Sequence, residues 1–546
     1  LKVNGKPAFP DALDTWYTQH GAQHGLNLVH AIAEDLGGEV SEAIRGFYYA
    51  SKYYLTDAST PKSAMVKHGM QVFVGKDLID DGVHDPNHPN DLATIIEGVL
   101  GGTLLTGALP SQMDQGGMSI SLSNLGYDKP HVTLTPVDGG IDFVVVITNF
   151  HTDLKVKAKL ELGPIKTSIS VSGDLKIAKL TIHSVVKMEA FNGQASASVV
   201  GTTAEIDGMK LHVDGIAGLF DALFNAILSG YIGELEKQIE STLESELAKA
   251  FGSIVDQLAI TQTIPLPALI EGGKATEITL VSTLDTLQFS PLGGLVLLDA
   301  SFVAQKGTAH TIKGALGRDG CMGKTTDAFV VDKTQRLQIA LHDDLANQML
   351  YAIWYSGAMT FTAPGSALAG SGGADLGGFS LENMVITVDM LLPPILEACN
   401  ATTEQGFNLQ VGDVFVEVAI DFVDEWLKLG MFAAVDIPAE LKLGEGANSG
   451  KELGISLGKD FAWLMELNSI SKGYEEDKGA WESIFKSQID KLLADGLPGL
   501  GDLKIPLPEL DLGALAPELG AGGGLTLVID SIHRGGGYTA IDARLD

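Results

Sequence analysis

Apolar residues recur at intervals of three and four over residues 216–258, which is the spacing of an α-helix. Up to Leu235 the apolar face is wide, as in a helix that is covered on more than one side. Beyond it the face narrows to single residues four apart, and Glu and Lys occupy the remaining surface. At about 1.5 Å per residue the helix would be roughly 60 Å long. We expect the rest of the chain to be arranged around it.

A second periodic run, Trp481 to Leu493, predicts another helix, and the same motif follows both runs. Ile-Pro-Leu-Pro stands at 264–267 and again at 505–508, and its prolines favour an extended exit from each helix. A strand, a Gly-rich turn and another strand come next, over 284–302 and 526–545. Asp299-Ala300 and Asp542-Ala543 fall at matching places in this pattern. The repetition predicts two similar domains in tandem.

Period-two alternation over 118–123 and 154–160 predicts strands with one apolar and one polar face. The pattern continues to residue 213, so a meander of antiparallel strands leads into the long helix. Before the meander, Asp91 is a predicted N-cap for a helix that contains Leu92, Ile95, Ile96, Val99 and Leu100.

The second half repeats this order. A strand over 337–341 precedes a helix that Asp343 or Asp344 would cap and that Gly357 would end. Strands then run from Met384 to Ile470 and lead to the second helix.

Residues 1–90 do not match the repeat. Residues 26–36 and 40–49 have helical spacing, which predicts a partly helical accessory region. The domain division that we predict is therefore 1–90 for the accessory region, 91–267 for a first barrel, 268–310 for linking strands and 311–546 for a second barrel.

This order of elements resembles the tubular lipid-binding (TULIP) superfamily, the two-barrel proteins typified by bactericidal/permeability-increasing protein, lipopolysaccharide-binding protein and cholesteryl ester transfer protein. The resemblance rests on three stretches and covers about residues 91–546. They are the helix 216–258, the strand-to-helix junction 337–347 with its continuation to Gly357, and the motif 505–508 leading into 527–529. Three features depart from the family: the extra N-terminal segment, two cysteines that both lie in the second half, and an acidic composition.

The resemblance implies an α+β fold shaped as an elongated boomerang. Each barrel would be a twisted antiparallel sheet wrapped around a long helix, and a central sheet with strands from 268–302 and 524–545 would join the two. Acyl chains would occupy apolar grooves between helix and sheet. The residues that we place along these grooves are Leu219, Phe220, Leu223, Phe224, Ile227, Met349, Leu350, Ile353, Trp354, Trp481 and Ile484. For each of them, ordinary core packing is the alternative.

Charge limits the partners. The formal net charge is −33 and the pI is about 4.6, which argues against nucleic acid and against electrostatic docking on an anionic membrane. Lysines concentrate only between 155 and 187, where they either meet lipid headgroups or form the solvated outer face of an edge strand. Hydrophobic residues make up 45% of the chain, and no apolar run reaches the roughly 18 residues of a membrane span. We expect a soluble protein.

No catalytic motif stands out, since Gly-x-Ser-x-Gly, His-Glu-x-x-His and paired Cys-x-x-Cys are absent. We therefore expect no enzyme, no cofactor and no metal. His20 and His24 could ligate a metal on a helix, but the glycines beside them disfavour one. The aspartates between 80 and 91 are suitable ligands for calcium, and their spacing favours turns and caps instead. Cys321 and Cys399 are either reduced or form one disulfide, and we favour the disulfide.

We predict an exported, non-enzymatic protein that binds or transfers phospholipid-like lipids, with transient contact with a membrane surface. The alternative is a structural or adhesive cell-surface protein that uses the same two-barrel scaffold, as a homo-oligomer or filament.

Overall fold

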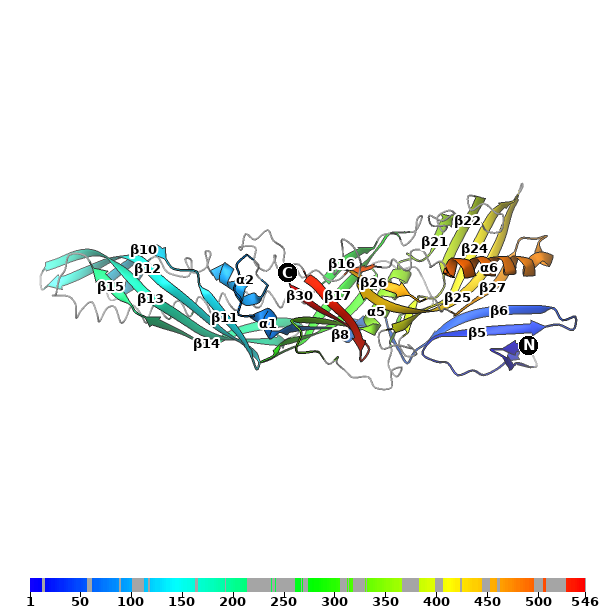
Figure 1. Ribbon diagram of the computed structural model, residues 1–546, viewed down its shortest axis with the longest axis horizontal. Helices are drawn as coiled ribbons and strands as arrows, with labels where there is room; N and C mark the ends of the chain where they lie inside the picture. Colours follow the sequence, from blue (N-terminus) through cyan, green and yellow to red (C-terminus); the bar gives the residue numbers. More distant parts are fainter. Residues whose placement is uncertain are drawn as a thin grey trace.

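The computed structural model is an elongated molecule in which two curled sheets lie at opposite ends of a central sheet (Figure 1). It describes residues 1–546 except 12–14, 56–60, 88–89, 101–111, 116–117, 163–164, 192, 214–236, 238–240, 242–260, 267, 269–273, 305–311, 313, 318–328, 330, 366–382, 398–405, 423–424, 444–451, 459–461, 495–503, 507–526 and 546. Among the described residues, no helix is both long enough and apolar enough to cross a membrane.

The first curled sheet is the predicted meander. Its two longest strands, β12 and β13, pair with each other along nearly their whole lengths. Alternate residues of β12, such as Phe143, Val145 and Ile147, are buried, as one covered face of a sheet requires. The order is β14 (Gln194–Asp207), β13 (Ile165–Phe191), β12 (Gly140–Leu162), β10 (Met118–Gly126) and β9 (Gln112–Gln115), with β11 (His131–Val137) paired to β12 and β15 (Lys210–Val213) to β13.

The central sheet contains strands from both halves of the chain. Its order is β16 (Thr261–Leu266), β17 (Thr276–Ser290), β18 (Gly293–Ala304), β8 (Val66–Gly75), β20 (Leu337–His342), β30 (Tyr538–Leu545) and β29 (Leu527–Gly535). The two hairpins β17–β18 and β29–β30 are the strand–turn–strand units that the sequence predicts. β8 lies within the segment 1–90 assigned to the accessory region, so the first repeat begins before residue 91.

This sheet is symmetric about the β8–β20 pair. Each of these strands has the second strand of one hairpin beside it and leads into a helix. Gln71 and Gln338 each lie four residues before the end of their strand, and both are completely buried. The tandem repeat is therefore visible in the strand pairing.

The predicted match between Asp299 and Asp542 is wrong by two residues. Counted from the turns of the two hairpins, Asp542 corresponds to Leu297. The aspartates that match are Asp285 and Asp530, because each lies where the pairing register of its hairpin shifts. Two Asp-Ala pairs in similar sequence surroundings do not suffice to align the hairpins, because a β-bulge shifts the strand register without changing the composition.

The second curled sheet lies at the other end of the molecule. Its order is β21 (Phe361–Pro364), β22 (Met384–Met390), β24 (Gly406–Phe422), β25 (Glu425–Leu443), β26 (Glu452–Leu457) and β28 (Lys504–Pro506), with β23 (Ile395–Glu397) paired to β24 and β27 (Ala462–Ile470) to β25. The two Ile-Pro-Leu-Pro motifs thus enter different sheets, since Ile264 lies in β16 and Ile505 in β28.

The described helices largely agree with the predicted ones. They are α1 (Lys76–Ile79), α2 (Leu92–Val99), α5 (Asp343–Tyr355) and α6 (Lys478–Ala494), with 3₁₀ turns at Pro61–Ala64 and Glu475–Asp477. Asp91 caps α2 as predicted and accepts from the Thr94 amide at 2.6 Å. α5 is instead capped by His342, whose side chain accepts from the Asp344 amide, and Gly357 follows its end at a φ of 80°.

Of the helix predicted over 216–258, only Lys237 and Ser241 are described, and both are helical and exposed. The remainder of that helix lies outside the described residues. The same is true of Cys321 and Cys399, so the disulfide stays a prediction.

The N-terminal region is β-sheet, and the helices predicted over 26–36 and 40–49 are wrong. These stretches form β5 (Gly25–Glu34) and β6 (Val40–Tyr49), which pair with each other in a sheet with β1 (Lys2–Val3) and β2 (Lys6–Pro7). Short apolar runs fit either period, and the turn residues between them decide. Here residues 35–38 form the turn, which the Gly38 amide closes on the Asp35 carbonyl oxygen, and Gly38 has a φ of 86°. Two small pairs complete the region, β3 (Phe9–Pro10) with β4 (Trp16–Tyr17) and β7 (Lys52–Tyr54) with β19 (Ala315–Gly317).

Candidate functional site

Four of the predicted groove residues lie in α5 and are core residues in the structure. Met349, Leu350, Ile353 and Trp354 are each 5% exposed or less. The Trp354 ring also donates from its Nε1 to the carbonyl oxygen of Met390. Leu350 packs in a cluster with strands of the second curled sheet, and the other three belong to a larger cluster that reaches the first curled sheet.

The two predicted residues in α6 lie elsewhere, on the inner face of the second curled sheet. Trp481 is half-buried against a cluster in which Phe485 of the same helix is buried. Ile484 is 37% exposed. The structure therefore does not bring the α5 and α6 residues together in one site. The first-half residues Leu219, Phe220, Leu223, Phe224 and Ile227 lie outside the described residues.

Strand register defines the inner face of the second curled sheet. Ile386 pairs with Val418, and Val418 pairs with Leu429, so these three side chains project from the same face. They are buried beneath α6, which lies across this sheet in Figure 1. Apolar alternation on neighbouring strands thus produces a continuous apolar surface.

Between the cluster under α6 and the cluster beside α5, this surface is less well covered. Six apolar side chains there are only half-buried, and we call them the apolar band. Its members are Val388, Met390, Val414, Val416, Val435 and Trp463. The register pairs Val388 with Val416, Met390 with Val414 and Val435 with Trp463, so the band crosses β22, β24, β25 and β27 on one face.

The sequence analysis did not single out the apolar band. It predicted strands in this region, but it took groove residues only from helices. The available signal was the alternation of β22, in which Met384, Ile386, Val388 and Met390 share a face. Val388 and Met390 are incompletely covered because of where α5 and α6 lie over the sheet, and the periodicity of the sequence does not predict that.

The outer face of the same sheet is covered by the N-terminal hairpin β5–β6. The Ile44 amide donates to Glu466 Oε2 at 2.8 Å, and Arg45 Nη1 lies 2.9 Å from the same oxygen. The Gly46 amide donates to Asp413. Burial raises the pKa of Asp413, although that amide and Arg45 act in the opposite direction. The hairpin therefore covers the outer face, and the apolar band lies on the opposite, inner face.

In the first curled sheet, those lysines of 155–187 whose side chains are described lie on the outer face. Lys155, Lys157 and Lys187 are exposed, and they alternate with buried residues such as Leu154 and Val186. Their strands β12 and β13 are interior strands of the sheet, so the predicted edge position is wrong. Because β12 and β13 each have a neighbouring strand on both sides, these lysines are not needed to protect a sheet edge. They form the solvent-facing side of the β12–β13 pair.

The aspartates between 80 and 91 act in turns and caps, as predicted. Asp80 accepts from the Gly82 amide, Asp81 from the Val83 amide and Asp85 from the Asn87 amide. Burial raises the pKa of Asp91, which caps α2. His20 and His24 lie in a segment that is neither helix nor strand, and each ring approaches the carbonyl oxygen of a different residue, Val3 and Gly317.

No protein-family model matches the chain, and no curated protein sequence matches it. Among solved structures, the crystal structure of lipopolysaccharide binding protein is similar with 12% sequence identity, a TM-score of 0.41 and coverage of 88% of this chain and 99% of that chain. P47 from Clostridium botulinum A2 is similar with 8% identity, a TM-score of 0.27 and coverage of 89% and 100%.

At these scores no residue of either neighbour is carried over to this chain. Lipopolysaccharide-binding protein is one of the two-barrel proteins that typify the superfamily named above, and a TM-score below 0.5 supports no further conclusion about this chain.

Proposed function

We propose that this protein binds the acyl chains of phospholipid-like molecules on the inner face of its second curled sheet, without catalysing a reaction. The observation that supports this is the apolar band, in which six apolar side chains on one face stay half-buried between two buried clusters. Covering such side chains with an acyl chain removes apolar surface from water, at roughly 25 cal/mol per Å².

The chemistry of the band suits an acyl chain. Its members are valines apart from Met390 and Trp463, and none carries a charge. A lipid leaves a bilayer at a cost of about 0.8 kcal/mol per CH₂, so a carrier need only offer an equally apolar surface. We extend the proposal to the first half, where the predicted helix 216–258 would cover the inner face of the first curled sheet and complete a boomerang of two such sites.

Fluorescence quenching tests the proposal at one residue. Bromine atoms on an acyl chain quench a tryptophan that they touch, and Trp463 is the tryptophan within the apolar band. We expect a phospholipid with brominated acyl chains to quench the full chain, and Trp463→Phe to lose most of that quenching.

Trp426→Phe is the matched control, because Trp426 is 49% exposed, lies outside the apolar band, and lies in the same sheet. Its removal should leave the quenching nearly unchanged. Mass spectrometry of the native protein should also find co-purified lipid. Quenching that is equal in the two variants, together with protein that carries no lipid, would contradict the proposal and favour a structural or adhesive role.

A further inference from the structure

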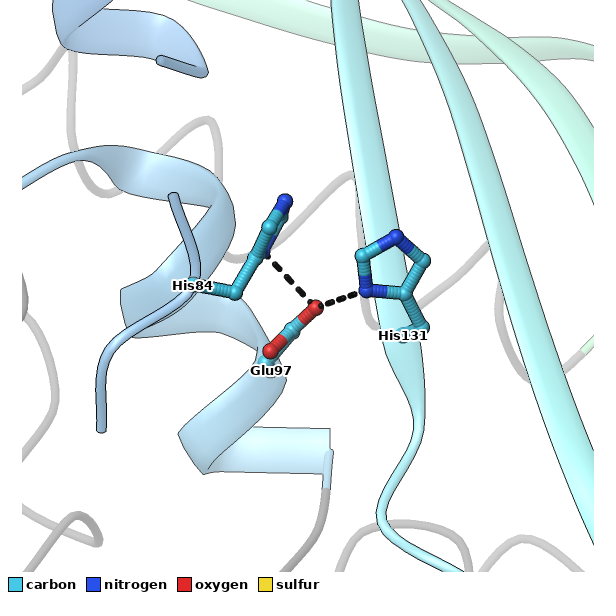
Figure 2. Close-up of side chains that lie close together, drawn as sticks. All are labelled: His84, Glu97 and His131. Carbon is cyan, nitrogen blue, oxygen red and sulfur yellow. Dashed lines mark ion pairs between the residues drawn. The ribbon is translucent and has the colours of Figure 1, made fainter. Parts of the chain in front are cut away.

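Three side chains from three separate segments converge beside the first curled sheet, and none of them was predicted as a site. His84 comes from the loop between α1 and α2, Glu97 from α2, and His131 from the start of β11 (Figure 2). Glu97 Oε1 lies 2.9 Å from His84 Nδ1 and 2.8 Å from His131 Nδ1. The two imidazole rings meet edge to face, with centroids 4.4 Å apart.

Glu97 Oε1 is crowded. Besides the two imidazole nitrogens, it accepts a hydrogen bond from the Val132 amide at 2.8 Å. A carboxylate oxygen has two lone pairs, and three nitrogens compete for them. The other oxygen, Oε2, lies 3.3 Å from Lys129 Nζ, so the lysine approaches the carboxylate from the opposite side.

Hydrogen bonding does not account for the position of His84. Its Nδ1 is buried and has no hydrogen-bond partner among the described residues, although it lies within 3 Å of Glu97 Oε1. The nitrogen is close to the carboxylate but is not directed at it as a donor would be. Buried nitrogens are nearly always satisfied, so something other than a proton on this nitrogen is expected between the groups.

We propose that His84, Glu97 and His131 form a binding site for a divalent transition metal ion, of which Zn²⁺ is the best match. Two imidazole nitrogens and one carboxylate oxygen are a ligand set for Zn²⁺ rather than for Ca²⁺ or Mg²⁺, which prefer oxygen. In a tetrahedral zinc site neighbouring ligand atoms lie roughly 3.3 Å apart, from bond lengths of about 2.0–2.1 Å. The present separations need to widen by only a few tenths of an ångström.

The surroundings support a metal ligand at His84. Its other ring nitrogen, Nε2, lies 3.7 Å from Asp80 Oδ1, and Asp80 is held in place because its Oδ2 accepts from the Leu134 amide at 2.8 Å. A carboxylate behind a metal-bound imidazole is a common arrangement that orients the ring. Water would occupy the fourth position, since the His131 side chain is 56% exposed.

A second group of similar residues makes a useful contrast. His68, Asp285 and Asp299 also lie close together. There the His68 amide donates to Asp299, His68 Nε2 lies 3.0 Å from Asp285, and Thr286 donates to the same carboxylate. Those hydrogen bonds explain the group without an ion, and it has only one imidazole.

Metal binding to the full chain is the direct test. The protein is stripped with a chelator, titrated with Zn²⁺ and desalted, and bound zinc is counted by mass spectrometry; Co²⁺ then reports the ligand geometry through its visible absorption. We expect one ion per chain and a Co²⁺ spectrum of a four-coordinate site. His131→Gln should weaken binding by at least about tenfold. Since His131 is largely exposed, this variant should fold, and circular dichroism checks that it does.

His183→Gln is the matched control, because His183 is also an exposed histidine beside a carboxylate, Asp142, in the same sheet. It should bind the metal as the wild type does. Glu97→Gln is the second variant, since glutamine can still accept from the Val132 amide while losing the charge that the ion needs. A wild type that takes up no zinc would overturn the proposal, and so would His131→Gln and Glu97→Gln proteins that bind zinc like the control.

Discussion

The two halves of the central sheet reach the same arrangement by different means. After β20 the chain enters α5 directly, and eleven of the 13 residues of that helix are buried. After β8 the corresponding chain forms one turn, α1, then a loop over 80–91, and only then α2. In this first half the aspartates of the loop, Glu97 and the histidines hold the segments together through polar contacts.

This difference shows how one element of a repeat can be fixed by a continuous buried helix or by a divided one with polar links. α5 contributes Trp354 and Met349 to a buried core, and its Asn347 and Gln348 side chains also donate to main-chain carbonyl oxygens of other segments. The first half divides the helix, and the loop then needs partners for its own amides.

The largest effect should follow from removing a large buried side chain from α5. Trp354→Ala removes a side chain that is 2% exposed, and a change of this kind costs about 3–5 kcal/mol of unfolding free energy. Urea denaturation followed by circular dichroism measures it. Trp426→Ala, at a site that is 49% exposed, should cost well under half as much. Equal losses would mean that α5 is not the anchor of its half.

A smaller effect is expected from the cap of α2 in the polar half. Asp91→Ala removes the acceptor for the Thr94 amide, and loss of an N-cap costs about 1 kcal/mol. Hydrogen exchange of the amides in 92–99 should accelerate about fivefold, which is the same free energy expressed as a rate ratio. Asp91→Asn keeps an acceptor at the cap and should exchange at close to the wild-type rate. If both variants exchange alike, the cap does not hold α2.

The smallest effect concerns the pH dependence of stability at Asp285, in the hairpin β17–β18. A hydrogen bond from the Thr286 hydroxyl, and then His68, lower the pKa of Asp285 despite partial burial. A carboxyl whose folded pKa lies below its unfolded pKa adds stability above the unfolded value, near 4, and that stability is lost as the pH falls through the folded pKa. Asp285→Asn should therefore lose less stability than the wild type between pH 6 and pH 3. Denaturation midpoints at the two pH values measure the difference, and parallel losses in both proteins would exclude a contribution from Asp285.

Much of the fold could be predicted, because it depends on local periodicity. The alternation that placed strands at 118–123 and 154–160 is the alternation seen in β10 and β12, and the Asp91 cap needed only its own neighbours. The hairpin β5–β6 was missed because its apolar spacing fits both periods and the Gly-Gly turn was not weighed against it. The start of the first repeat was also placed too late, since β8 and β20, aligned on their buried glutamines, share no other identical residue.

The candidate sites were harder to predict, because they depend on distance in space. His84, Glu97 and His131 follow no metal-binding motif, and only the packing of α2 against β11 brings them together. Likewise, the side chains of the apolar band differ from ordinary core side chains only in being less completely buried. The predicted groove residues in α5 had the right character, yet both neighbouring clusters close over them.

The N-terminal hairpin has a consequence for biosynthesis. The Ile44 amide and the Glu466 carboxylate that bind each other are separated by 422 positions in the chain. During translation β5 and β6 must therefore wait until the residues 422 positions later have been made before their docking surface exists. A contact between residues so far apart in the chain slows the final step of folding. A holding factor that shields Ile44, which is buried once the hairpin has docked, would raise the yield of native protein in the interval.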